Sequence, residues 1–282
     1  MTGNYPLAGM VTLFNPDKDI TGNIASYVEQ LDKLYLVDNS PQKPEAIIAQ
    51  LTTNPKIVYV SMHGNQGIAA ALNKALDLAI ADGFDWLLTM DQDSQFTENG
   101  FADYVSQLPR VLAQEQHVYG LCVTTLDDKE RWPTFSQTAS CITSGMILNT
   151  DFARKAGGFR TDFFIDEVDL EFCYRCNRLC GTLIRYGRPI MHHQLGDSFH
   201  PRLLGHTFGT MNEKYLRWYY IMRNRLYVMQ AYPEVRLSYG IATLKALIKI
   251  VLFEPDKYRK LRYACRGLCD FLRGKKGGLP AC

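Results

Sequence analysis

Two aspartates, Asp91 and Asp93, stand one residue apart at the end of a largely apolar run that spans residues 84–90. In a β-strand, residues i and i+2 point to the same side, so the two carboxylates would lie close together. Their charges repel each other unless a cation lies between them. Oxygen ligands of this kind suit Mg²⁺ or Mn²⁺, which proteins hold through one or two carboxylates and substrate phosphates. The pair predicts a metal and phosphate site, although a short motif of this type also occurs at ordinary polar strand ends.

A second group of acids follows the apolar run 163–165, and it comprises Asp166, Glu167, Asp169 and Glu171. Acids in the first turn of a helix interact favourably with the helix dipole, which is one explanation for the group. Four acids are more than that effect requires, and crowded carboxylates raise one another's pKa. A carboxylate with a raised pKa suits general base catalysis. The residues alone leave both explanations open.

His193 follows a short predicted strand and is a third candidate for chemistry. An imidazole there could complete the shell of the metal predicted at Asp91 and Asp93. A single histidine is more often an ordinary polar group, and this alternative also stays open.

The elements that would position these residues alternate along the chain. Continuous apolar runs predict buried strands, and helical patterns fall between them, which together favour parallel βαβ units. The predicted strands are 7–14, 34–37, 57–60 and 86–90, and the predicted helices are 20–31, 43–51 and 68–81. Open sheets of this class bind ligands beyond the carboxyl ends of their strands. Polar residues follow all four predicted strands there, which predicts a nucleotide site: Asn15, Asp38, Asn65 and Asp91.

Beyond residue 100 the pattern continues with further strands and helices. The predicted helices are 101–114, 170–179, 215–232 and 239–253, and the predicted strands are 118–123, 142–148, 183–186 and 189–190. The fold class is therefore α/β, followed by a helical C-terminal segment.

The charge distribution divides the chain. Residues 1–210 contain 16 basic and 24 acidic residues, a net charge of −8, and residues 211–282 contain 15 and 5, a net charge of +10. This asymmetry predicts an acidic domain at 1–210 that could hold a cation and a basic segment at 211–282 that faces an anionic partner.

The eight cysteines are read as free thiols of a cytosolic protein, although Cys173, Cys176 and Cys180 share a helical spacing. The first residues show no signal peptide, and no uncharged run approaches the roughly 20 residues of a membrane-spanning helix. The expected location is cytoplasmic.

Taken in order, these segments resemble the inverting family 2 glycosyltransferases of the GT-A fold, and most closely bacterial rhamnosyltransferases of cell-surface polysaccharides. The resemblance covers about residues 7–230. The matching segments are residues 11–16, Val37-Asp38-Asn39-Ser40, residues 65–69 with Asn73, Met90-Asp91-Gln92-Asp93-Ser94, Ser144-Gly145, residues 164–171, His193-Gln194-Leu195-Gly196, and Tyr219-Tyr220 with Arg223-Asn224. The resemblance implies a Rossmann-like, mostly parallel sheet flanked by helices.

The resemblance also implies roles for individual residues. Thr12 and Asn15 would line the nucleotide pocket, and Asp38 would contact the nucleobase. Asn65 and Gly67 would shape the loop beside the nucleotide. A further set would bind metal, diphosphate or acceptor. In this set Asp91 and Asp93 would hold the Mg²⁺ or Mn²⁺ that bridges the diphosphate, His193 would be a further metal or diphosphate contact, and Tyr220, Arg223 and Asn224 would contact acceptor or diphosphate.

The catalytic base is expected among the acids at 166–169. The common family pattern places the base at Glu167 in a strict alignment, whereas rhamnosyl-type members often lack an acid there, which favours Asp166. Asp166 is therefore the expected base, and Glu167 is the main alternative. Asp169 would have a structural role or would orient the acceptor.

The implied reaction is an inverting, metal-dependent hexosyl transfer. Its donor would be dTDP-rhamnose or a UDP-hexose, and its acceptor a saccharide, often lipid-linked, as in O-antigen synthesis. The basic amphipathic stretch 239–276 would then bind the inner face of the cytoplasmic membrane through anionic lipids. The alternative is a helical cap that packs on the catalytic domain and exposes a basic face.

Three other functions are less consistent with the residues. A sugar-nucleotide pyrophosphorylase needs a glycine-rich basic loop after its first strand, which residues 14–17 do not supply. A processive synthase needs membrane-spanning helices and a glutamine at position 214, which is lysine here. A nucleic-acid binder conflicts with the acidic residues of 1–210, and no nucleic-acid motif is visible.

Overall fold

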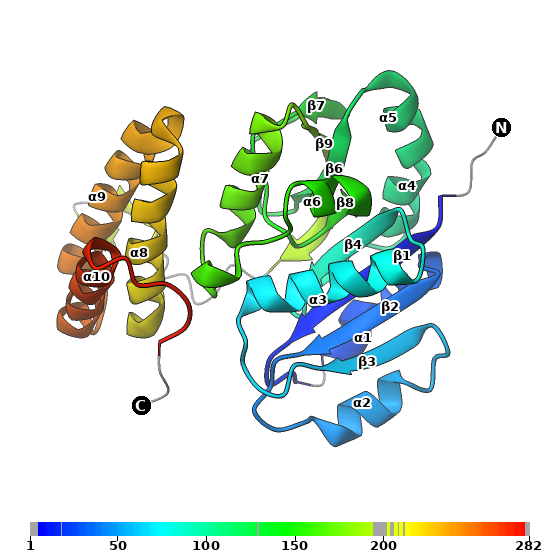
Figure 1. Cartoon of the computed structure of the whole chain (residues 1–282), viewed down its shortest axis with the longest axis horizontal. Coiled ribbons are helices and arrows are strands. Elements are labelled where there is room, and N and C mark those ends of the chain that lie inside the picture. Colours follow the sequence, from blue (N-terminus) through cyan, green and yellow to red (C-terminus); the bar gives the residue numbers. More distant parts are fainter. Residues whose placement is uncertain are drawn as a thin grey trace. The chain divides into compact units, whose positions relative to one another are not determined.

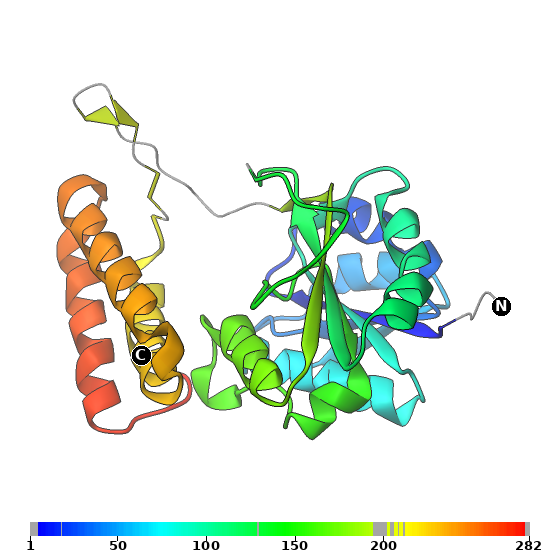
Figure 2. The same ribbon diagram turned by 90° about the horizontal axis from the view of Figure 1, so that it is seen from above.

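The computed structural model describes residues 5–17, 19–128, 130–193, 202–203, 206–207, 209–210 and 212–279. The chain forms two compact units. Unit 1 comprises Met1–Arg160 and Asp169–Gln194, and unit 2 comprises Thr161–Val168 and Leu195–Cys282 (Figures 1 and 2). The segment Thr161–Val168, which holds two of the four clustered acids, therefore belongs with the C-terminal helices, and the functional division at residue 210 stays a prediction.

Unit 1 is built on one mixed sheet. Its main path has the order β3-β2-β1-β4-β8-β6-β9-β5, and β7 pairs with β9. The first four strands on this path are parallel, β6 and β9 are parallel to each other, and β8 runs antiparallel to both β4 and β6. The strands are β1 Leu7–Leu13, β2 Lys33–Asp38, β3 Ile57–Ser61, β4 Trp86–Asp91, β5 Ser94–Phe96, β6 Val118–Thr125, β7 Phe135–Gln137, β8 Met146–Asn149 and β9 Thr182–His193.

Helices flank this sheet (Figure 1). They are α1 Ile20–Ala25, α2 Glu45–Leu51, α3 Ile68–Ala81, α4 Gly100–Ser106, α5 Leu108–Gln114, α6 Thr150–Lys155 and α7 Val168–Arg178, with the short 3₁₀ turn η1 Val28–Gln30. The 3₁₀ turn η2 Thr161–Phe163 belongs to unit 2. Apolar side chains of β1 to β4, of the later strands β6, β8 and β9, and of the helices α1, α2, α4 and α5 form one buried core cluster. The predicted α/β class, the first four strands and the helix 68–81 are confirmed.

Several predicted boundaries are wrong for local reasons. The helix predicted at 20–31 breaks into α1 and η1. The Ser26 hydroxyl donates to the Asn23 carbonyl at 2.6 Å, and this bond competes with the backbone hydrogen bonds that would continue the helix. The helix predicted at 101–114 divides before Pro109, which has no N–H to continue it. The strands predicted at 183–186 and 189–190 form the single strand β9. Its pairing with β6 shifts register on both sides of Pro189, which lets the strand continue past a residue without an N–H.

Asn73 of α3 connects that helix to the glycine turn at residues 157–158. Its amide nitrogen donates to the Phe159 carbonyl at 2.8 Å, and its amide oxygen accepts from the Phe159 N–H at 2.7 Å. A Cβ atom at Gly158 would lie 2.5 Å from that same oxygen, so the close approach requires glycine. Asn73, one of the residues that carry the resemblance to the family, therefore has a structural contact in unit 1.

Replacing Asn73 with alanine is expected to lower the free energy of unfolding by about 1–3 kcal/mol, because both backbone groups of Phe159 lose their partner. Urea unfolding followed by circular dichroism measures this change. Lys74→Ala, at the exposed neighbouring position on α3, is the matched control. Equal stability of the two variants would contradict the assigned contact.

In its described residues, unit 2 consists mainly of three long helices. They are α8 Tyr215–Ala231, α9 Arg236–Phe253 and α10 Lys257–Leu272, with the 3₁₀ turn η3 Pro233–Val235 and a small antiparallel pair, β10 Arg202–Leu203 and β11 His206–Thr207. A Cβ atom at Gly267 would lie 2.4 Å from the Tyr219 carbonyl, so glycine permits the close packing of α8 and α10. None of the helices in the described part of the chain combines the length and the apolar character that a membrane-spanning helix needs.

Candidate active site

The carboxyl ends of β1 to β4 lie along one edge of the unit 1 sheet because these strands are parallel. Asp38 at the end of β2 is buried, and its carboxylate accepts from the Tyr59 hydroxyl at 2.9 Å and the Ser40 N–H at 2.9 Å. Ser40 in turn accepts from the Asn15 N–H at 2.8 Å, which ties the loop after β1 to the loop after β2. Hydrogen bonds thus connect the polar groups along the edge that is predicted to bind a nucleotide.

The loop that precedes α3 joins this network through Asn39. The Asn39 amide donates to the Gly67 carbonyl at 3.1 Å and accepts from the Gln66 N–H at 3.2 Å. The Asn65 side chain accepts from the Gly67 N–H at 3.0 Å, and Gly67 has a φ of +85° that favours glycine. Thr12, on β1, has a buried hydroxyl with no hydrogen-bond partner among the described residues.

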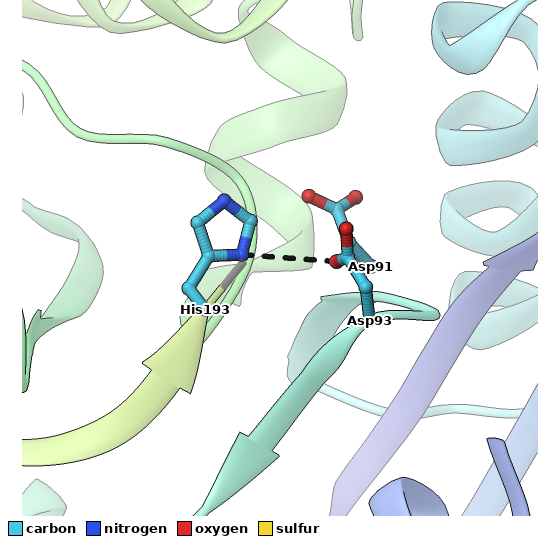
Figure 3. A group of neighbouring side chains, drawn as sticks. All are labelled: Asp91, Asp93 and His193. Atoms are coloured by element: carbon cyan, nitrogen blue, oxygen red, sulfur yellow. Dashed lines mark ion pairs between the residues drawn. The ribbon is translucent and has the colours of Figure 1, made fainter. Parts of the chain in front are cut away.

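Asp91, Asp93 and His193 converge at the end of β4 (Figure 3). One ligand atom from each of them lies within 4.8 Å of the other two, and His193 Nδ1 is 3.8 Å from Asp93 Oδ1. Asp91 ends β4 and Asp93 follows it, whereas His193 ends β9. The antiparallel pairing of β5 with β9 places Ser94 opposite His193 and so brings the histidine to the two acids. Two carboxylates and an imidazole in this arrangement are a suitable ligand set for a divalent cation.

Two buried serines, Ser94 and Ser144, form hydrogen bonds to the candidate ligands. The backbone N–H of Asp91 donates to Ser144 Oγ at 3.2 Å, and Ser144 Oγ donates to Ser94 Oγ at 2.7 Å. Ser94 Oγ lies 2.7 Å from His193 Nδ1. If Nε2 binds a metal, Nδ1–H becomes the donor to Ser94, which is the usual outer-shell arrangement for a metal-bound histidine. Both serines belong to family motif segments, but the sequence assigned them no role.

Gln92, between the two acids, has a structural contact of its own. Its side chain accepts from the Phe14 N–H at 2.8 Å and donates to the Phe14 carbonyl at 3.2 Å. Its backbone carbonyl accepts from the Asn23 amide at 2.8 Å. Gln92 and Asp93 line a pocket of about 490 Å³ together with Asp17, Asp19, Gly22, Asn23, Gln95 and His192. The pocket opens beside the candidate metal ligands of unit 1.

The acids at 166 and 167 lie in unit 2, in a backbone of unusual conformation. Phe164, Asp166 and Glu167 have φ values of +68°, +64° and +63°. Non-glycine residues in this region store strain, which persists only where neighbouring contacts impose it. Such outliers cluster at functional sites and support a functional role for this segment.

Asp166 forms an ion pair with Arg217 of α8, at 2.5 Å between Oδ1 and Nη2, and only 8% of its side chain is exposed. Burial raises the pKa of Asp166 above its ordinary value, and the positive charge of Arg217 opposes that rise. Arg217 also pairs with Glu213 at 2.8 Å, so the guanidinium is shared between two carboxylates.

Both oxygens of Glu167 are occupied. Arg225 Nε donates to Oε1 at 2.8 Å, and the Tyr239 hydroxyl donates to Oε2 at 2.9 Å. A carboxylate held by two donors is fixed in orientation and has less freedom to move toward an acceptor. Arg217 likewise contacts both oxygens of Asp166, at 2.5 and 3.4 Å, so these contacts do not decide between the two acids, and Asp166 as the base stays a prediction.

Arg223 and Asn224 hold the backbone of this segment. Arg223 is 1% exposed and donates to the Phe163 carbonyl at 3.0 Å, and Asn224 is fully buried and donates to the carbonyls of Ile165 and Asp166 at 2.7 and 3.0 Å. Tyr220 stacks on Phe164 with ring centroids 5.2 Å apart. These contacts favour a positioning role, and the direct acceptor or diphosphate contact predicted from the sequence stays a prediction.

The other two clustered acids belong to the first turn of α7 in unit 1. Asp169 accepts from the N–H of Leu170 at 2.9 Å, as expected of an acid at a helix N-terminus. Glu171 is buried and forms a two-point ion pair with Arg175, with distances of 3.1 and 2.8 Å. The ion pair with Arg175, one turn further along α7, therefore accounts for Glu171. Residues 194–196, which complete the histidine motif, lie outside the described residues.

Comparison with known proteins identifies the family. A family model described as glycosyl transferase family 2 matches residues 10–165, more than half of the chain. The chain therefore belongs to glycosyl transferase family 2, and it is a glycosyltransferase.

Individual relatives are more distant. The dTDP-rhamnosyl transferase RfbF of Shigella flexneri is 23% identical over 300 aligned positions, which cover 98% of each chain. The crystal structure of residues 1–349 of S. aureus TarS superposes with a TM-score of 0.57 at 11% identity and covers 94% of this chain and 80% of that chain. The same TarS fragment in complex with UDP-GlcNAc gives 0.57 at 14% identity, covering 95% and 81%. These structures agree with the predicted GT-A fold.

Proposed function

We propose that this glycosyltransferase is an inverting, metal-dependent enzyme that transfers L-rhamnose from dTDP-rhamnose to a saccharide acceptor during surface polysaccharide synthesis, as in O-antigen. The observation that supports it best is the convergence of Asp91, Asp93 and His193 at the sheet edge that also carries Asp38. The similarity to a dTDP-rhamnosyl transferase supports the choice of sugar.

On the donor side, Asp38 and the loop at Asn65 and Gly67 would bind the nucleoside, with Thr12 and Asn15 lining the pocket. Asp91, Asp93 and His193 would hold Mg²⁺ or Mn²⁺. When bound, the cation supplies positive charge that stabilises the leaving diphosphate. Without that charge the two carboxylates would repel the diphosphate, which is the physical reason for assigning a cation to this ligand set.

On the acceptor side, Asp166 would act as the general base. It would take the proton from the acceptor hydroxyl as that oxygen attacks the anomeric carbon and the bond to the diphosphate breaks, with inversion of configuration. Glu167, held by Arg225 and Tyr239, would position the segment, and Arg223 and Asn224 would hold its backbone. Asp169 would orient the helix start or the acceptor.

Release of nucleoside diphosphate from a panel of nucleotide sugars with Mn²⁺ tests the proposal. Fastest release from dTDP-rhamnose in the presence of acceptor is the expected result. Release from every sugar at the rate of the uncatalysed reaction would contradict the proposal.

A second donor class is supported by a different observation. The TarS fragment of the same fold was solved with UDP-GlcNAc, so a UDP-hexose is the alternative donor. The same panel of nucleotide sugars distinguishes the two donors. A preference for UDP sugars would mean that the enzyme transfers another hexose in place of rhamnose, and its membership of the family would be unaffected.

We place the enzyme at the inner face of the cytoplasmic membrane, where a lipid-linked acceptor would be available. The support is the net charge of +10 over residues 211–282, which favours an anionic surface.

The pH dependence of transfer follows from the surroundings of Asp166. The base must be deprotonated, and burial raises its pKa, so kcat/KM is expected to fall on acidification through a pKa above the ordinary aspartate value. Arg217→Gln removes the charge that opposes this rise, so the acidic limb is expected to move to higher pH. The profile of kcat/KM against pH measures the shift, with the exposed neighbour Lys214→Gln as control. An acidic limb that stays in place in Arg217→Gln would contradict the assignment.

A further inference from the structure

Helix α9 of unit 2 exposes one continuous apolar face. Six large apolar side chains on it are between 46% and 76% exposed: Leu237, Ile241, Leu244, Ile248, Val251 and Leu252. Their spacing of three and four residues places them on a single stripe, which we call the α9 stripe. The opposite side of the helix carries the buried residues Thr243 and Ile250. An exposed apolar stripe of this length is characteristic of a protein or membrane contact.

Two lysines follow one edge of the α9 stripe. Lys245 and Lys249 are next to Leu244 and Ile248 in the sequence, and both line a pocket of about 290 Å³ whose other walls are formed by Trp218, Arg225, Ala242, Ala246 and Glu254. Lysine at such an edge can place its stem on apolar surface and its charge at the boundary with water. The stripe and the pocket therefore form one amphipathic surface.

The charges of the pocket do not cancel. Arg225 is paired with Glu167 at 2.8 Å, and Glu254 is paired with Lys260 at 2.8 Å. Lys249 donates to the Gly209 carbonyl at 2.6 Å, a contact that leaves its charge uncompensated. Neither Lys245 nor Lys249 has an acidic partner in the part of the chain that the structure describes. Two positive charges beside an apolar stripe favour an amphiphile with an anionic head group.

We infer that the α9 stripe with Lys245 and Lys249 is a docking surface for an anionic phospholipid bilayer. The lysines would bind lipid phosphates at the pocket, and the stripe would enter the apolar layer below the head groups, as interfacial helices do. The inference deepens the proposed membrane location, on which it rests. Charge complementarity favours lipid over a second copy of the chain, because a symmetric contact would bring the same uncompensated lysines together.

The docking surface is also connected to the catalytic segment within unit 2. Arg225 forms a wall of the pocket and holds Glu167, and Tyr239 at the start of α9 holds the same carboxylate. Lipid bound at Lys245 and Lys249 would therefore lie beside the contacts that position residues 166–167.

Flotation of the full chain with vesicles tests the inference. The protein is expected to float with vesicles of phosphatidylglycerol and phosphatidylcholine, and not with phosphatidylcholine alone. The double variant Lys245→Glu with Lys249→Glu is expected to lose at least about 25-fold in partition coefficient, from about a 5-fold contribution of each lysine. Leu244→Ser with Ile248→Ser is expected to lose a similar amount. High salt should weaken binding of the wild type.

The matched control reverses two exposed charges on α10, as Lys257→Glu with Arg262→Glu, and is expected to float like the wild type. Equal loss in both charge-reversed variants would overturn the inference in favour of general electrostatic attraction. Dimers in the absence of vesicles that become monomers in Leu244→Ser with Ile248→Ser would also overturn it, in favour of a second copy. Binding of dTDP-rhamnose by the wild type is measured separately, so failure of the docking surface and failure of the proposed function are distinguishable.

Discussion

Replacement of Asp166 by asparagine is expected to lower kcat by about 10²–10⁴-fold, the usual contribution of a general base. The amide keeps the shape of the side chain but cannot take the proton. The folded protein holds the Asp166 proton more tightly than the unfolded chain, because burial raises its pKa. Ionisation of Asp166 therefore lowers stability as the pH rises through that pKa, and asparagine avoids this cost. The thermal midpoint of unfolding should not fall.

Glu213→Gln is the matched control for this experiment, because Glu213 pairs with the same Arg217 and stands outside the predicted site. It is expected to retain transfer activity. Product release at saturating donor and acceptor measures kcat, and donor titration shows whether binding persists. Full activity of Asp166→Asn together with an inactive Glu167→Gln would contradict the assignment and identify Glu167 as the base.

Replacement of Asp93 by alanine is expected to reduce transfer at least about 100-fold, since a bound cation contributes several kcal/mol to stabilisation of the leaving group. The same variant is expected to lose binding of Mn²⁺ measured by calorimetry without any substrate. Excess EDTA should inactivate the wild type to a similar extent, and added Mn²⁺ should restore it.

Asp77→Ala removes an exposed carboxylate from α3 of the same unit and controls for the change in net charge. It is expected to bind Mn²⁺ and to transfer sugar as the wild type does. Wild-type activity that persists in EDTA, or unchanged Mn²⁺ binding in Asp93→Ala, would rule out the metal role of this cluster.

Much of the nucleotide edge of unit 1 could be predicted from the sequence. The first four strands are short, continuous apolar runs, and each is followed within a few residues by a polar side chain. Parallel pairing then places Asp38 and Asp91 on the same edge without further information. The proximity of Asp91 and Asp93 is also local, because they stand two residues apart in the chain.

Contacts distant in the sequence could not be predicted in the same way. His193 reaches the two acids because β9 pairs antiparallel with β5, about 100 residues earlier in the chain. Ser144 joins the same network from the residues just before β8. Neither serine nor Gln92 shows a periodicity or spacing that would mark its hydrogen bonds, because those bonds depend on loops brought together by the sheet.

The acids at 166–171 show most clearly which properties follow from the amino-acid sequence and which follow from the tertiary structure. Their number, and their position just before and within the first turn of a helix, can be read from the amino-acid sequence, since both are local properties. The tertiary structure then distinguished Asp166 from Glu167, because Arg217 lies beside Asp166 whereas Arg225 and Tyr239 hold Glu167. The ion pair of Glu171 with Arg175 is local, since the two residues stand four apart in α7. The partners of Asp166 and Glu167 come from helices more than 50 residues away. The pKa of a carboxylate depends on its burial and on neighbouring charges, and the fold alone sets both.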